Sequence, residues 1–267
     1  MPRRNWNKVF VTGGTGFVGL RVLSALVEAG ADVTALVLPD HEKRLGVLRR
    51  YVQVVYGDVW NAASLKGRAR GHGVVVHMVG SLRAQPERGL TYRQLNLVSA
   101  RNVIGMAVGD GVPYLVLLSA AYRPAGVPKE YLQSKRDAEA YLRASGLRWA
   151  IVRAPLLFDR AQAGGRFFAF LSWVGTLPLL RVFFGRRTPL PVDVVARGMA
   201  QLALQPELPP DRVVYAGDLR RLGRVPRGWR PRVAVRGVRV ARTAANAEES
   251  EVPFGWLPPP PSEHRSR

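Results

Sequence analysis

The chain has 267 residues, of which 47% are hydrophobic and 22% charged, a composition typical of a folded globular protein rather than a disordered or fibrous one. It contains no cysteine, which excludes disulfides, thiolate metal sites and cysteine nucleophiles. The formal net charge of +21 comes mostly from arginine and favours anionic ligands or surfaces without choosing among them.

The first residues predict a strand, a glycine-rich turn and a helix. An apolar run over Lys8–Thr12 leads into TGGTGFVG, after which apolar residues recur at helical spacing until Gly30. Glycines spaced GxGxxG at this place allow a tight turn, a close approach of the backbone to a pyrophosphate, and tight packing of helix on strand. We therefore predict a dinucleotide site formed by Thr12, Gly13, Gly14, Thr15, Gly16, Phe17, Val18 and Gly19.

The rest of the chain up to Pro155 alternates strands with helices, which predicts an α/β fold of Rossmann type with a doubly wound parallel sheet. In this fold ligands bind at the carboxyl ends of the strands. The expected strands are Asp32–Leu38, Val52–Tyr56, Val74–Met78, Tyr114–Ser119 and Trp149–Arg153, and the expected helices are Leu95–Val108 and Glu130–Ser145.

Beyond Pro155 the sequence changes in character, and we predict a small C-terminal substrate-side lobe over about residues 156–222, within a Rossmann domain of residues 1–222. Phe167–Phe184 is strongly apolar, Asp193–Leu204 has the pattern of an amphipathic helix, and Val213–Tyr215 predicts a short strand. Residues 223–267 are rich in arginine and proline, which predicts a basic, partly disordered tail.

The stretch FFAFLSWVGTLPLLRVFF is interrupted by Gly175, Pro178 and Arg181, so we do not expect a membrane-spanning helix. It is expected either to cover a substrate pocket or, with its flanking arginines, to lie on an anionic membrane surface and admit a lipophilic substrate. The amino terminus lacks the pattern of a signal peptide. We expect a cytoplasmic protein, either free or peripheral to the membrane.

The choice between NAD and NADP depends on the loop after the second strand. That strand ends in Val37 and Leu38, without the carboxylate that usually binds the ribose hydroxyls of NAD. Asp40 follows slightly later, whereas His41, Lys43 and Arg44 offer positive charge for a 2′-phosphate. The sequence slightly favours NADP over NAD.

Tyr131 and Lys135 are four residues apart, so they share one face of the predicted helix. A nearby ammonium group favours the phenolate and is expected to lower the tyrosine pKa, which would allow Tyr131 to act as a general acid or base. Ser119 ends the preceding strand at the same rim and is expected to hydrogen-bond a substrate carbonyl or hydroxyl.

Seven blocks in order, VFVTGGTGFVG, VVYGDV, VVHMVG, LNLVSARNVI, LLSA, YLQSK and IVRAPLLF, resemble those of extended and atypical short-chain dehydrogenase/reductases over roughly residues 8–204. The atypical branch, which includes NmrA-like proteins, epimerase-like proteins and the nucleotide-binding accessory subunit of respiratory complex I, is the most similar. Two features differ from the extended members of this superfamily: the end of the second strand, and the short segment after Pro155. A sugar-nucleotide epimerase is therefore not expected.

The resemblance implies roles for further residues. Ser119, Tyr131 and Lys135 match the catalytic serine, tyrosine and lysine, with Lys135 also holding the nicotinamide ribose. Asn96 matches an asparagine that supports this lysine through water. The remaining cofactor contacts implied by the resemblance are Asp58 and Val59 beside the adenine, Met78, Val79 and Gly80 along the cofactor channel, and Pro155 beside the nicotinamide.

We therefore predict an NAD(P)-dependent oxidoreductase that transfers hydride between nicotinamide and a carbonyl or hydroxyl substrate. The alternative is a cofactor-binding scaffold or sensor without turnover, associated with a membrane or a respiratory complex. Nucleic-acid binding through the tail is a third reading, but no nucleic-acid motif accompanies the charge. No metal site is expected, and the substrate and oligomeric state do not follow from the sequence.

Overall fold

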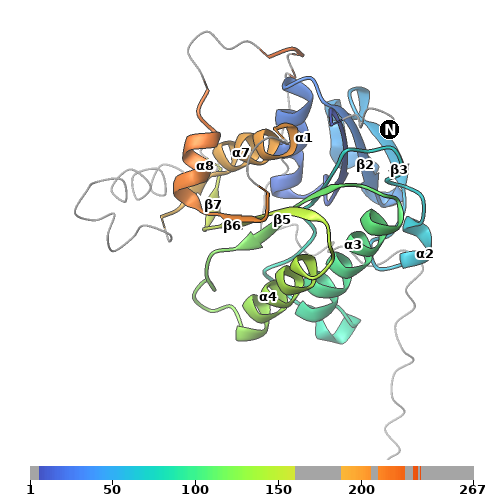
Figure 1. The fold of residues 1–267 in the computed structure, drawn as a ribbon. Coiled ribbons are helices and arrows are strands. Elements are labelled where there is room, and N and C mark those ends of the chain that lie inside the picture. Colours follow the sequence, from blue (N-terminus) through green and yellow to red (C-terminus); the bar gives the residue numbers. More distant parts are fainter. Residues whose placement is uncertain (1–5, 160–187, 206–209, 226–230, 234, 236–267) are drawn as a thin grey trace, which may run out of the picture.

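Figure 1 shows the computed structural model of the chain, which describes residues 6–159, 188–205, 210–225, 231–233 and 235. A seven-stranded sheet in the order β3-β2-β1-β4-β5-β6-β9 forms its centre, and neighbouring strands are parallel throughout. The strands are β1 (Lys8–Thr12), β2 (Asp32–Val37), β3 (Gln53–Tyr56), β4 (Val74–His77), β5 (Tyr114–Ala120), β6 (Arg148–Ala154) and β9 (Arg212–Val214). This arrangement confirms the predicted Rossmann-type fold.

The central strands are rich in valine and leucine because both faces of the sheet are covered by helices. Side chains alternate between two apolar clusters: Val9 and Val11 face the layer of α1 and α7, whereas Phe10 faces the layer of α3 and α4. The helices are α1 (Phe17–Glu28), α2 (Ala62–Leu65), α3 (Ser99–Gly109), α4 (Lys129–Arg143), α7 (Val192–Leu204) and α8 (Ala216–Leu222).

Strand order reverses between β1 and β4, because the chain first runs outward through β2 and β3 and then returns to the other side of β1. In doubly wound sheets this switch opens a crevice at the carboxyl ends of the strands. The glycine turn after β1 and the residues after β4 both lie at this edge. The fold therefore places the predicted cofactor residues where such folds bind nucleotides.

Several elements differ from the prediction. The helix expected over Leu95–Val108 begins as the π-helix η3 (Arg93–Val98) before continuing as α3, and the 3-10 segments η1 (Pro39–Arg50) and η2 (Pro86–Arg88) were not predicted. The short strand expected near Val213–Tyr215 is β9, the seventh strand of the main sheet.

In the described part of residues 156–222, α7 and β9 join the main layers, while two short strands form a separate sheet. β7 (Leu157–Phe158) pairs with β8 (Leu190–Pro191), and α7 packs beside α1. The apolar stretch Phe167–Phe184 lies outside the described residues, as does most of the tail. Within the tail, Arg232 donates its backbone N–H to the Glu28 carbonyl at 2.9 Å, and Val233 and Val235 pack partly against the α1 and α7 cluster.

In the parts of the chain that the structure describes, none of the helices has the length and apolar character needed to cross a membrane.

Candidate functional site

The glycine turn between β1 and α1 is tightly packed. Gly13 has φ +76°, and a Cβ atom there would lie 2.9 Å from the backbone of Met78 and Val79. A Cβ on Gly19 would lie 2.1 Å from the Gly13 carbonyl oxygen, so only glycine lets α1 start this close to β1. They correspond to the tight turn and the close packing of helix on strand that a dinucleotide-binding turn requires.

The amino terminus of α1 is open toward the same edge. Its N-cap is Gly16, which has no capping side chain, and no acidic residue lies in its first turn. The first N–H groups of a helix have no acceptor within the helix and carry partial positive charge, so they suit a pyrophosphate. The residues present thus fit a dinucleotide at this turn.

Gly80, after β4, is where the predicted catalytic and cofactor residues meet. Its φ is +153°, and a Cβ atom there would lie 2.3 Å from Lys135 Nζ and 2.5 Å from Asn96 Oδ1. Lys135, 7% exposed, donates from Nζ to the carbonyls of Val79 at 3.4 Å and Leu118 at 3.5 Å. The structure therefore brings Lys135 and Asn96 together beside Gly80, directly after β4.

Tyr131 is 7% exposed, and its ring meets that of Tyr92 edge-on at 5.8 Å. Burial raises the pKa of Tyr131 to about 12, a shift that the charge of Arg136 opposes and Tyr92 increases. The predicted lowering of this pKa by Lys135 is thus wrong for this structure, because desolvation of the phenolate outweighs the positive charge around it. Tyr131 is a protonated phenol at neutral pH.

Asn96 is buried in η3, where its Nδ2 donates to Ser134 Oγ at 3.0 Å. Its Oδ1 has no hydrogen-bond partner among the described residues. A buried acceptor beside an ammonium group is a place where a bridging water is expected, which agrees with the role that the resemblance implied.

Ser119 is buried at the end of β5, and its hydroxyl donates to Glu139 Oε1 at 2.6 Å. Glu139 lies on α4 one turn beyond Lys135 and is fully buried. Sequence reasoning missed Glu139, although an acidic residue at the i+4 position from Lys135 on the buried face of the helix was a signal for it.

Asp58 and Val59, expected beside the adenine, follow β3 at the same edge of the sheet. The Asp58 carboxylate accepts the Trp60 N–H at 2.8 Å, and the Val59 carbonyl accepts from Asn102 Nδ2 at 2.9 Å. Asp58 therefore fixes the turn that carries Val59. Pro155 is buried directly after β6, at the carboxyl edge where the resemblance placed it.

His77 ends β4 and was also missed, because it lies within a run of valines that predicts only a buried strand. Its Nδ1 is 2.7 Å from the hydroxyl of Thr12, one of the predicted cofactor residues, and its Nε2 has no partner among the described residues. Burial, followed by the charge of Lys135, lowers the pKa of His77 to about 3. The imidazole is therefore neutral beneath the cofactor channel.

The loop after β2 forms η1, where Asp40, Lys43 and Arg44 are exposed. Glu42, the other acid of this loop, accepts hydrogen bonds from Arg49 and from the Tyr56 hydroxyl. The hydrogen bond from Tyr56, followed by that from Arg49, holds the pKa of Glu42 below its ordinary value. Glu42 is thus engaged in holding η1 against β3.

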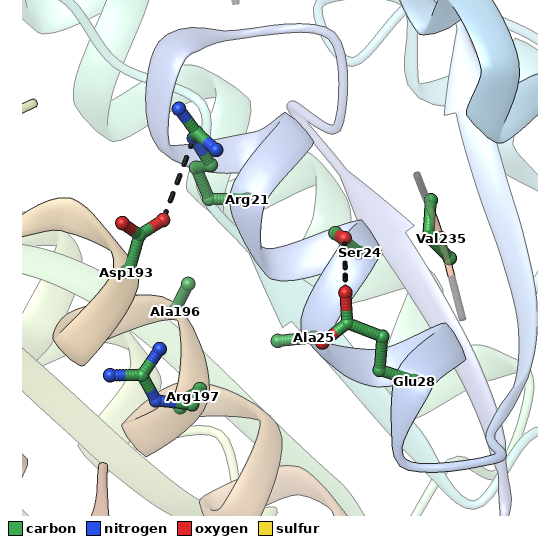
Figure 2. Close-up of a pocket in the computed structure, with 8 residues that line it drawn as sticks. All are labelled: Arg21, Ser24, Ala25, Glu28, Asp193, Ala196, Arg197 and Val235. Atoms are coloured by element: carbon green, nitrogen blue, oxygen red, sulfur yellow. Dashed lines mark hydrogen bonds and ion pairs between the residues drawn. The ribbon is translucent and has the colours of Figure 1, made fainter. Parts of the chain in front are cut away.

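A groove of about 310 Å³ lies between α1 and α7, on the opposite face of the sheet from α4 (Figure 2). Salt bridges and hydrogen bonds cross it or run along it, including Arg21 with Asp193 at 3.6 Å and Ser24 with Glu28 at 3.0 Å. It contains none of the predicted site residues. Within the described ranges, no cluster of three or more histidine or acidic residues could hold a metal ion.

The glycine turn at the switch point and the start of α1 without a capping side chain are the features of a dinucleotide-binding α/β protein. The chain belongs to the NAD(P)H-binding family, whose model matches residues 13–170. Its relatives and fold neighbours include proteins named as reductases, epimerases and dehydratases, which agrees with the resemblance of the sequence blocks.

Two relatives are named for different reactions. Ceramide reductase of Caulobacter vibrioides is 30% identical over 150 residues, which cover 56% of this chain and 46% of that protein. UDP-glucose 4-epimerase of Azospirillum brasilense is 32% identical over 169 residues, which cover 55% of this chain and 48% of that protein. The chain thus spans about half the length of the curated relatives it matches.

Solved structures show the same fold at low identity. An NAD+-bound enzyme of Bordetella bronchiseptica is 21% identical with a TM-score of 0.57, covering 78% of this chain and 75% of that chain. The dTDP-glucose 4,6-dehydratase of Streptomyces venezuelae, with NAD bound, is 21% identical with a TM-score of 0.56, covering 77% and 74%. The chain therefore shares the fold of NAD-bound enzymes, and the family that its own model match shows is one of NAD(P)H-binding proteins.

Proposed function

We propose that this protein is an NAD(P)-dependent oxidoreductase in which Tyr131 exchanges a proton with the substrate oxygen. The observation that carries the proposal is the meeting of Lys135, Asn96 and Gly80 after β4, with Tyr131 one helical turn before Lys135 on the buried face of α4. The match to ceramide reductase supports a reductase.

The bound nicotinamide would supply or accept the hydride at the substrate carbon. Lys135 would hold the nicotinamide ribose, since its ammonium group lies at the channel against the Val79 carbonyl. Tyr131, protonated at neutral pH because burial raises its pKa to about 12, would give its hydroxyl proton to a carbonyl oxygen. The reductive direction, which needs a proton donor, suits this ionisation state.

NADP(H) is the proposed cofactor form. Lys43 and Arg44 are exposed on η1, where a 2′-phosphate is expected, and the nearby acid Glu42 accepts from Arg49 and Tyr56. Asp40 is the competing group, because its carboxylate would favour the ribose hydroxyls of NAD. NADPH should therefore bind more tightly than NADH, and the Lys43→Ala/Arg44→Ala double variant should reduce that preference about tenfold.

The test of the catalytic role is Tyr131→Phe, with Tyr141→Phe as the matched control on the exposed side of the same helix. Nucleotide-stripped protein is titrated with NADPH and NADH by cofactor fluorescence, and reduction of a panel of aldehydes and ketones is followed by NADPH oxidation. Tyr131→Phe should keep NADPH affinity within about threefold and lose about a hundredfold or more of turnover. Retained turnover would remove Tyr131 from the mechanism.

A scaffold or sensor that binds nucleotide without turnover is the second candidate. It is favoured by the high pKa of Tyr131 and by the hydroxyl of Ser119 being directed to Glu139. In that case NADPH should raise the melting temperature of the wild type while no carbonyl is reduced. Tyr131→Phe would then change nothing beyond nucleotide affinity.

A further inference from the structure

The carboxylate of Glu139 accepts hydrogen bonds from four different side chains. Oε1 accepts from Ser119 at 2.6 Å, from Arg136 Nη1 at 2.5 Å and from Arg153 Nε at 3.0 Å. Oε2 accepts from Arg153 Nη2 at 2.6 Å and from Arg143 Nη2 at 3.2 Å. The side chain itself is fully buried. A buried charge is tolerated only when it is paired and hydrogen-bonded in this way.

The ionisation of Glu139 fixes the direction of its bond with Ser119. Burial alone would raise the pKa of Glu139, but the hydrogen bonds from Arg153 and Ser119 and the charges of Arg136 and Arg153 outweigh it and hold that pKa below its ordinary value. An ionised carboxylate can only accept hydrogen bonds. Ser119 must therefore donate its single hydroxyl proton to Glu139, and its oxygen, which already accepts from Arg136 Nη1 at 3.4 Å, has only acceptor capacity left toward any ligand.

The same network joins α4 to the ends of two strands. Arg136 donates from Nη2 to the carbonyls of Ala120 at 2.9 Å and Ala121 at 3.4 Å, directly after Ser119. Arg153, near the end of β6, also donates from Nη1 to the Tyr215 hydroxyl at 2.8 Å, at the start of α8. A single buried carboxylate thus connects α4, β5, β6 and α8.

Glu139 lies on the helix face that carries the proposed catalytic pair, because Tyr131, Lys135 and Glu139 follow at intervals of four residues. Ser119 therefore bonds a residue that lies eight positions beyond Tyr131, about 12 Å along the helix axis. Its hydroxyl is directed toward the far end of this face rather than toward the phenol.

We infer that Glu139 is a positioning residue of the candidate site: it takes the hydroxyl proton of Ser119 and holds the Tyr131–Lys135 helix against the ends of β5 and β6. The Ser119 hydroxyl then donates to Glu139 and not to the substrate carbonyl, whose oxygen receives its proton from Tyr131. This inference rests on the proposed function for the identity of the site, but the link between Ser119 and Glu139 can be tested separately.

The experiment is a double-mutant cycle of Ser119→Ala and Glu139→Gln in the full chain, read by melting temperature and by NADPH affinity. Glu139→Gln should lower the melting temperature by roughly 10 °C, because it removes the fully buried charge that pairs with three partly exposed arginines, and weaken NADPH binding about tenfold through displacement of Lys135. Ser119→Ala alone should lower the melting temperature by about 3 °C and, in the Glu139→Gln background, by less than about 1 °C.

Two variants serve as controls. Ser119→Thr keeps the hydroxyl and should restore both readouts, and Glu130→Gln makes the same charge change on the exposed first turn of α4 and should affect neither. If the Glu139→Gln variant does not fold, Glu139→Asp is used in its place. Aspartate keeps the charge, but its side chain is shorter by one methylene.

Additive effects of Ser119→Ala in the two backgrounds, or no effect of Ser119→Ala on the melting temperature, would overturn the inference. For any carbonyl that the wild type reduces, Ser119→Ala and Glu139→Gln should lower kcat by similar, non-additive factors. A loss of about a hundredfold with Ser119→Ala that adds to that of Glu139→Gln would mean that Ser119 contacts the substrate. If no nucleotide binds at all, the proposed function fails, while the melting-temperature cycle still tests the link.

Discussion

Gly80 is the residue where a single added methyl group would test the site most directly. A Cβ there would lie 2.3 Å from Lys135 Nζ and 2.5 Å from Asn96 Oδ1, and a residue other than glycine is strained at φ +153°. Gly80→Ala should therefore weaken NADPH binding about tenfold or more by pushing Lys135 out of the channel. Fluorescence titration measures this. Gly105→Ala, within α3 where an added Cβ meets nothing within 4 Å, should leave the affinity unchanged.

The burial of His77 leads to a prediction of how the free energy of unfolding depends on pH. Burial and the charge of Lys135 lower the pKa of His77 to about 3, whereas an unfolded chain has a histidine pKa near 6.5. Below about pH 6.5 the unfolded state binds a proton that the native imidazole does not, so His77 makes stability fall with decreasing pH, by about 1.4 kcal/mol per pH unit, down to about pH 3.

Urea unfolding of the wild type and of His77→Gln at pH 7, 6 and 5 checks this. Between pH 6 and pH 5 the variant should lose about 1 kcal/mol less stability than the wild type. His72 is also buried, and burial, the largest cause, lowers its pKa, so some acid sensitivity should remain in the variant. Equal slopes for the two proteins would mean that His77 is already protonated in the native state.

At the residue scale, the sequence indicated which positions lie together at the carboxyl edge of the sheet but not which partners their side chains bind. The pairing of Tyr131 with Lys135 on one helix face was found from spacing alone. The direction of the Tyr131 pKa shift was not predicted correctly, because it depends on burial by segments distant in the sequence. Likewise, nothing near Ser119 in the sequence indicates that its partner is Glu139, twenty residues later.

At the scale of the element, the turn before α1 predicts a contrast between two neighbouring glycines. A Cβ on Gly19 would collide with backbone, 2.1 Å from the Gly13 oxygen, which cannot move without displacing the turn. A Cβ on Gly14 would meet the Leu23 side chain at 2.9 Å, a group that can rotate. Gly19→Ala should therefore lower NADPH affinity roughly a hundredfold, or prevent folding, while Gly14→Ala should cost less than about tenfold.

The two variants are compared by circular dichroism, melting temperature and NADPH titration. Equal losses for both would show that the turn tolerates no added volume anywhere, and that the packing of α1 against Gly13 is not what sets the affinity.

Helices and strands were predictable from the sequence where one pattern of apolar residues dominated. Buried parallel strands such as β1, β4 and β5 are runs of apolar residues between turn residues, and each was found within a residue or two of its bounds. β9, with three residues, and α8, with seven, are too short to show a period, so their place in the main layers came only from the tertiary structure. η1 was missed because its polar residues and Gly46 resemble a loop.

At the scale of the whole molecule, the positive charge is not confined to the tail. Residues 223–267 hold nine arginines and four glutamates, so most of the +21 excess belongs to the first 222 residues. A charge of this size attracts anionic surfaces over about 10 Å at moderate ionic strength. We therefore expect the full chain to associate with membranes that carry anionic phospholipid.

Cosedimentation with vesicles tests that expectation. The protein should sediment with vesicles that contain anionic phospholipid at about 50 mM salt and be released at about 500 mM, because salt screens the charges. It should not sediment with neutral vesicles.

Replacement of Arg236, Arg239 and Arg242 by serine should weaken vesicle binding by about 1 kcal/mol per residue if the tail contacts the surface. The replacement should leave binding unchanged if the first 222 residues make the contact. Binding that survives high salt would instead point to apolar contact, for which Phe167–Phe184 is the candidate segment. Failure to sediment with anionic vesicles at low salt would end the membrane hypothesis and leave the charge to the nucleotide and to other anionic partners.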